Sequence, residues 1–133
     1  MLLEKAEDLR LLKKKYKVPL YDHMTITIAI TNDMQLGFKK ITGLSREDPS
    51  VGLFFHNGGN DCWIILNTAD LFGHTLDAGM IAHEALHATN YILEYIGMKP
   101  TEQSEESYTY LLQWIVNESH KLLDKYKLEY GAE

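Results

Sequence analysis

With 133 residues, the chain is long enough to bury the core of one domain, and its 45% hydrophobic and 24% charged residues are typical of a globular protein. Its formal net charge of −6 argues against nucleic-acid binding, which requires a basic face. We therefore expect a single domain over residues 1–133, with no nucleic-acid partner.

The N-terminal part is predicted to form a helix followed by a strand. Apolar residues recur near the helical period at the start of the chain, which predicts an amphipathic helix over residues 1–17 that Pro19 ends. Residues 24–31 alternate isoleucine with threonine, a pattern that predicts a strand with one buried face. Residues 32–50 contain several turn signals and look irregular.

Two more strands are predicted at residues 51–56 and 62–67. Both are apolar runs, and the sequence NGGND between them is typical of a hairpin turn. Together with the preceding strand they predict a small, mostly antiparallel sheet of three or four strands within residues 24–67.

Two long helices are predicted after the sheet, at residues 75–97 and 102–126. Thr75 can cap the first helix, while Gly97 and then Pro100 end it. Helices of this length can cover one face of the sheet, so the fold class that we expect is α+β.

The first long helix contains the sequence HEALH, which is typical of a metal site with its own base. A spacing of four places His83 and His87 on successive turns of one helix face, so both imidazoles can bind one ion. Glu84 lies at the shoulder of this face, where it can take a proton from a metal-activated water instead of binding the ion. The apolar residues of the helix lie opposite, so the histidines should face a cleft. The alternative is a polar helix face with two exposed histidines.

A tetrahedral zinc site needs a third protein ligand, and the second long helix offers two carboxylates in its first turn. Glu106 follows His87 after eighteen intervening residues, and the short loop between the helices should keep them adjacent. Glu105 is the alternative, because the helical wheel places it on the apolar side of this helix. We predict Glu106 as the third ligand of a Zn²⁺ ion.

The motif H-E-x-x-H, followed after eighteen residues by Glu106 and the sequence SYTYL, resembles the gluzincin class of zinc metallopeptidases. It also resembles small phage and mobile-element proteins with the same core. Residues 75–118 carry this resemblance. It implies a minimal zincin-like domain in which His83, His87 and Glu106 bind zinc and Glu84 is the general base. The implied function is a zinc-dependent hydrolase, a peptidase acting on a peptide or protein substrate.

Other residues are candidates for supporting roles at such a site. In zincins, a strand in the position of residues 62–67 offers its edge to an extended peptide. Tyr108 or Tyr110 is a candidate donor to the oxyanion, although a core tyrosine is the more common role. Asn90 and Glu94 continue the histidine stripe and could orient the imidazoles, or simply be solvent-exposed.

Two other functions are considered. The protein could be a catalytically inactive zincin scaffold of phage or mobile-element origin that binds a metal or a partner, because it is small and has no obvious second lobe. Glu84 and His87 also form the E-x-x-H pair of di-iron carboxylate bundles. Such a site needs a second pair of this kind, which the sequence lacks.

The sequence also predicts a cytoplasmic location. Cys62 is the only cysteine, which excludes an intrachain disulfide and fits a reducing compartment. The N-terminus is charged throughout, unlike a signal peptide. No segment approaches the roughly 18 consecutive apolar residues that span a membrane, so no membrane association is expected. The sequence does not indicate an oligomeric state.

Overall fold

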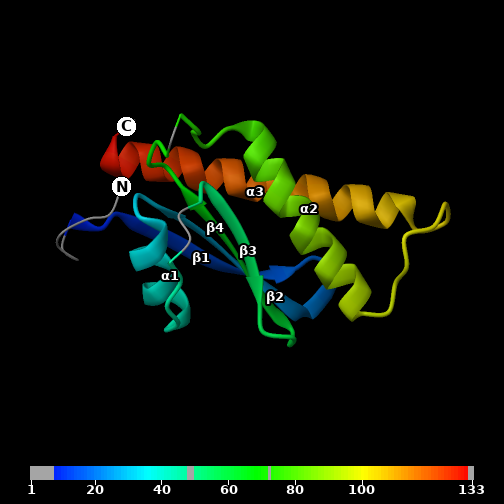
Figure 1. Cartoon of the computed structure of the whole chain (residues 1–133). Helices are drawn as coiled ribbons and strands as arrows, with labels where there is room; N and C mark the ends of the chain where they lie inside the picture. The colour runs from blue at the N-terminus through cyan, green and yellow to red at the C-terminus, as the bar shows by residue number, and fades with distance from the viewer. Residues whose placement is uncertain (1–7, 48–49, 72, 132–133) are drawn as a thin grey trace.

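A computed structural model describes residues 8–47, 50–71 and 73–131 of the chain. In these residues the fold is α+β, with a mixed sheet of four strands and three helices (Figure 1). In chain order the elements are β1 (Leu11–Val18), β2 (Tyr21–Thr31), α1 (Met34–Thr42), β3 (Gly52–His56), β4 (Asp61–Asn67), α2 (Ala78–Tyr95) and α3 (Glu105–Tyr130).

The strands are arranged in the order β1-β2-β4-β3. The pairs β1–β2 and β3–β4 are antiparallel, whereas β2 and β4 run parallel, from Thr25 opposite Asp61 to Thr31 opposite Asn67. A parallel pair requires a crossover connection, and here α1 and β3 lie within that connection. The sheet is therefore mixed, with two antiparallel pairs and a parallel pair at its centre.

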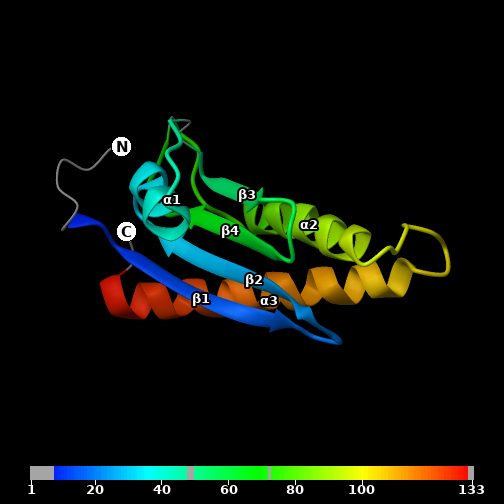
Figure 2. The same ribbon diagram turned by 90° about the horizontal axis from the view of Figure 1, so that it is seen from below.

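The two faces of the sheet are covered by different helices (Figures 1 and 2). Side chains alternate between faces along a strand, so β2 and β4 each contribute to two hydrophobic clusters. The larger cluster lies against α2 and α3, and the smaller one lies against α1. From the two central strands, the larger cluster receives Met24, Ile26, Ile28, Ile30, Cys62, Ile64 and Leu66, and the smaller receives Ala29 and Ile65.

The predicted helix over residues 1–17 is wrong from Leu11 onward, where the chain forms the edge strand β1. Residues 1–7 lie outside the described part of the chain. Leu12 and Tyr16 pack against the larger cluster at even spacing, but Lys14 interrupts the alternation. The local pattern is therefore ambiguous, and pairing with β2 decides the conformation. Lysines are also typical of edge strands, where they disfavour pairing with other chains.

Helix α1 lies within residues 32–50, which were expected to be irregular. Its N-cap is Asp33, whose side chain accepts a hydrogen bond from the Leu36 N–H at 3.1 Å. Gly43 ends the helix with a left-handed φ of 76°. Both caps are visible in the sequence, so this short helix could have been predicted.

The predicted strands at residues 24–31, 51–56 and 62–67 are confirmed as β2, β3 and β4. The two long helices are also confirmed, with shifted ends. Asp77 caps α2 instead of Thr75, accepting a hydrogen bond from the Met80 N–H at 2.8 Å. None of the helices in the described residues is long and apolar enough to cross a membrane.

Candidate metal centre

Helix α2 presents the two histidines of the HEALH sequence, His83 and His87, on its exposed side. Its opposite side is buried against the sheet and α3 through Ile81, Ala85, Ala88 and Ile92. The side chain of His83 is 62% exposed, and His87 is also exposed. As the helical wheel predicts, the apolar side of the helix is buried and the two imidazoles lie on the other side, where an ion from solvent can reach them.

The two imidazoles point toward each other. The Nε2 atoms of His83 and His87 lie 3.3 Å apart, and the rings are nearly perpendicular. Two nitrogens bound to one tetrahedral zinc ion at about 2.0–2.1 Å are separated by about 3.3–3.4 Å. The separation of the two nitrogens therefore matches that of two ligands of one zinc ion. Without an ion, the same distance allows a hydrogen bond between the rings.

Glu84 completes a cluster with the two histidines. Its Oε2 atom lies 4.0 Å from Nε2 of His83, and the ligand atoms of all three residues lie within 4.8 Å of one another. The 4.0 Å separation exceeds the distance expected between two ligands of one tetrahedral zinc ion. This distance suits a carboxylate that would contact a metal-bound water better than the ion itself.

The carboxyl group of Glu84 is buried although it adjoins an exposed face, with only 7% of its side chain accessible. Burial raises the pKa of Glu84, because the charged form loses solvation. The nearby imidazoles of His83 and His87 and a hydrogen bond from the backbone N–H of Phe54 act in the opposite direction. The group is therefore in an environment where a proton can be accepted.

The strand beside this cluster is β3, not the strand at residues 62–67. That strand, β4, is paired on both sides, with β2 and with β3, and therefore offers no free edge. Strand β3 is the outer strand and contacts α2. The expectation that residues 62–67 present an edge to a peptide is wrong, because parallel pairing with β2 places β4 inside the sheet.

An aromatic row connects β3 to α2. The ring of Phe54 stacks on His87 with centroids 6.4 Å apart, and His56 stacks on Tyr91 at 4.0 Å. The Tyr91 hydroxyl donates to the Gly59 carbonyl at 2.5 Å, in the turn between β3 and β4. Sequence reasoning did not identify these residues. The position of Tyr91, one turn after His87, was the available signal.

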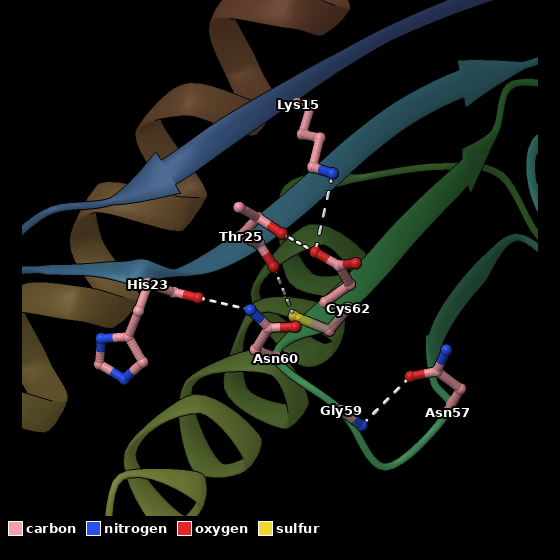
Figure 3. A network of polar contacts seen from close by, with 8 residues as sticks. Lys15, His23, Thr25, Asn57, Gly59, Asn60 and Cys62 are labelled. Carbon is pink, nitrogen blue, oxygen red and sulfur yellow. Dashed lines mark hydrogen bonds and ion pairs between the residues drawn. The ribbon is translucent and has the colours of Figure 1, made fainter.

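The start of β4 is held beside β2 by a polar network on the same hairpin (Figure 3). The Asn60 side chain donates to the His23 carbonyl at 2.7 Å. Asp61 accepts from the Thr25 hydroxyl and lies 3.7 Å from the Lys15 ammonium. These contacts set the register of the parallel pair, and the position of β3 follows from that register.

Cys62 belongs to this network but not to the metal centre. Its thiol donates weakly to the Thr25 carbonyl at 3.8 Å (Figure 3). Burial, and to a smaller extent the charge of Asp61, raises its pKa to about 12. The thiol therefore stays protonated near neutral pH, and its position excludes it from binding the ion with the histidines.

Glu105 and Glu106 are both exposed in the first turn of α3, and neither belongs to the cluster. The Tyr108 hydroxyl donates to the Met98 carbonyl at 3.3 Å, so the first turns of α3 lie beside the chain that leaves α2. His87 lies eight residues before the end of α2, about 12 Å along the helix axis. In both views, the start of α3 extends beyond the end of α2 (Figures 1 and 2). Ligation by Glu106 stays a prediction.

The other candidate supporting residues are Asn90 and Glu94 on α2 and Tyr108 and Tyr110 on α3, and none of them belongs to the cluster. Tyr108 is occupied by its bond to Met98, and Tyr110 is 66% exposed. Asn90 and Glu94 line a shallow pocket with Tyr108. An interaction of these residues with the imidazoles or with an oxyanion stays a prediction.

Comparison with known proteins gives no match to a family model, to a curated protein or to a solved structure. The interpretation of the site therefore depends on the chemistry and geometry of its own residues.

Proposed function

We propose that the protein is a zinc-dependent hydrolase that cleaves a peptide or protein substrate. The observation that carries the proposal is the 3.3 Å separation of the His83 and His87 nitrogens, with the buried Glu84 carboxylate 4.0 Å from His83. Imidazole nitrogens are common zinc ligands, and a carboxylate at this distance suits a general base. A zincin-like fold and metallopeptidase activity are parts of this proposal.

The residues divide the chemistry between them. A bound zinc ion would polarise the scissile carbonyl and lower the pKa of a water molecule. His83 and His87 hold the ion in place through Nε2. Glu84 accepts the proton of the attacking water and delivers it to the leaving amine. Its buried position suits this transfer, because desolvation raises its pKa toward the working range of a base.

Glu106 is the third ligand in this proposal, on the spacing of eighteen residues after His87. The first turn of α3 is exposed and lies beside the chain that leaves α2, so Glu106 would join the ion only if this turn approached His87. The loop between the two helices contains residues 96–104 and is the segment where such a movement would occur.

The experiment that tests the function combines metal analysis with a conservative variant. Protein purified without a histidine tag should contain about one zinc ion per chain. It should also hydrolyse members of a peptide library. Glu84→Gln should keep the zinc and lose at least about 100-fold in turnover, because it removes only the base. A metal-free wild type, or a Glu84→Gln variant with full turnover, would contradict the proposal.

A second candidate function is metal binding without catalysis. It is favoured by the composition of the cluster, which draws all three of its residues from α2 and omits Glu106. In this case the protein binds zinc, no peptide is cleaved, and Glu84→Gln changes no measured property apart from metal affinity. The same metal analysis and turnover assay distinguish the two functions.

A further inference from the structure

The strand β3 lies very close to the Glu84 side chain at Gly52, a position where any larger residue would collide with it. Gly52 begins this strand, and its φ lies outside the left-handed region, so its backbone conformation is open to any residue. Glycine inside a strand weakens it, and it often marks a place where another group approaches the backbone. The backbone conformation therefore does not require glycine at position 52, whereas the limited space around it does.

That space is filled by Glu84. A Cβ atom added at Gly52 would lie 2.9 Å from Cγ of Glu84 and 3.1 Å from its Oε2. It would also lie 3.1 Å from Cγ of Met80. A side chain at position 52 therefore cannot coexist with the present position of Glu84. The methionine is flexible and can move, whereas the Glu84 side chain is 7% exposed and buried between the strand and its own helix.

The strand also brings a backbone N–H toward the same group. Among the described strands β3 pairs only with β4, and the backbone N–H of Phe54 acts to lower the pKa of the Glu84 carboxyl group. In an antiparallel pair, alternate residues direct their backbone groups away from the partner strand. The Asn67 N–H donates to the Val51 carbonyl at 2.7 Å, so in this register Gly52 and Phe54 direct their backbone groups away from β4. Gly52 leaves room for the carboxylate, and the Phe54 N–H points outward on the same side of the strand.

We propose that Gly52, together with the outward-facing backbone of β3 at Phe54, is the positioning element that holds the Glu84 carboxylate beside the two histidines. The inference deepens the proposed hydrolase and assumes that Glu84 is its base. Neither Gly52 nor Phe54 touches the substrate in this role. They act through Glu84, by preventing its carboxylate from rotating into solvent.

Gly52→Ala is the direct test. The variant should keep its zinc affinity, because His83 and His87 are unchanged, and should lose about 100-fold in kcat with little change in KM. Gly79→Ala is the matched control, since a Cβ there meets only Asp77 Oδ1 at 3.4 Å. It should retain wild-type kinetics. Gly52→Ala with unchanged kcat would overturn the proposal.

The effect of crowding Met80 must be distinguished from the effect of crowding Glu84, because the new methyl group of Gly52→Ala would touch both side chains. The double variant Met80→Ala/Gly52→Ala removes the contact with Met80 and leaves the contact with Glu84. It should be as defective as Gly52→Ala, relative to Met80→Ala alone. Recovery of kcat in the double variant would assign the effect to Met80 and overturn the proposal.

A measurement on the metal-free protein separates this proposal from the proposed function. The Phe54 amide proton, observed by NMR, should be shifted downfield and exchange slowly in the wild type, because it binds a carboxylate. Glu84→Gln and Gly52→Ala should both move this resonance, and Gly79→Ala should not. An unchanged Phe54 amide in Glu84→Gln would overturn the positioning role even if Gly52→Ala does not fold. Absence of hydrolysis by the wild type would overturn the hydrolase alone.

Discussion

The proposed chemistry depends on three residues within five positions of the chain. His83 and His87 contribute two nitrogens at the separation that a tetrahedral zinc ion requires, and Glu84 contributes a carboxylate at a longer distance. The histidines are exposed, whereas the carboxyl group is buried. In the proposed function, this difference in exposure separates the two ion-binding residues from the residue that would accept a proton.

Cys62 provides a prediction at the residue scale, because its burial raises the pKa of the thiol from its ordinary value of 9.0 to about 12. A rise of three units lowers the thiolate fraction about 1000-fold near pH 8. Alkylation by iodoacetamide at pH 8 should therefore be at least about 1000-fold slower in the folded protein than in urea. Mass spectrometry of timed samples measures both rates.

The upward direction of the Cys62 pKa shift also predicts how the free energy of unfolding depends on pH. The folded pKa of Cys62 exceeds the unfolded value, so the contribution to stability is complete below pH 9 and is lost as the pH rises toward 12. Cys62→Ala should not become labelled and should lack this alkaline loss. Equal alkylation rates in the folded and unfolded wild type would contradict the burial of the thiol.

At the scale of the elements, the site is formed where α2 lies beside the edge strand β3. The stacks of Phe54 on His87 and of His56 on Tyr91 hold the strand against the helix. On the other side α2 contacts α3, which also covers β1 and β2. The offset between α2 and α3 decides which part of α3 is level with the histidines, and this offset depends on the loop between the helices.

The neighbouring carboxylates of α3 provide the prediction at this scale. We expect Glu106→Gln to weaken zinc binding by about 10-fold or more, because it removes a charged ligand from the ion. Glu105→Gln, the matched control, should leave the affinity unchanged. Competition with a chromophoric chelator measures both affinities. Equal affinities for wild type and Glu106→Gln would show that α3 does not contribute to the metal centre.

At the scale of the whole molecule, the sheet separates two hydrophobic clusters of unequal size. The larger lies beneath α2 and α3, and α1 covers the smaller on the other face. The close approach of α1 to the end of β2 depends on Gly37, where an added Cβ would lie 2.9 Å from Oγ1 of the buried Thr31.

Gly37→Ala should therefore destabilise the protein, although alanine normally stabilises a helix relative to glycine. Overpacking of this kind costs about 1–3 kcal/mol in the free energy of unfolding. Gly79→Ala in α2 should instead stabilise the protein by about 0.5–1 kcal/mol, because no crowded contact opposes the gain in helix propensity. Urea denaturation measures both changes. A stabilising Gly37→Ala would contradict the packing of α1 on β2.

Strong periodic patterns and caps predicted much of the fold. The alternation of Ile26, Ile28 and Ile30 with threonines identified β2, and the sequence NGGND identified the hairpin. The predicted N-terminal helix was wrong from Leu11 onward. Lys14 interrupts the alternation of apolar and polar residues that would have indicated a strand, and pairing with β2 decides the conformation. Helix α1 was overlooked although Asp33 and Gly43 cap it, because its nine residues are a short periodic signal.

The sequence by itself determined that His83 and His87 share one exposed helix face and that Glu84 lies at its shoulder. An α-helix places residues four apart on successive turns whatever surrounds it, so this geometry is local. Only the tertiary structure decided that β3 lies against Glu84 and that the first turn of α3 lies at the far end of α2. Both depend on contacts between segments distant in the sequence, which no local pattern specifies.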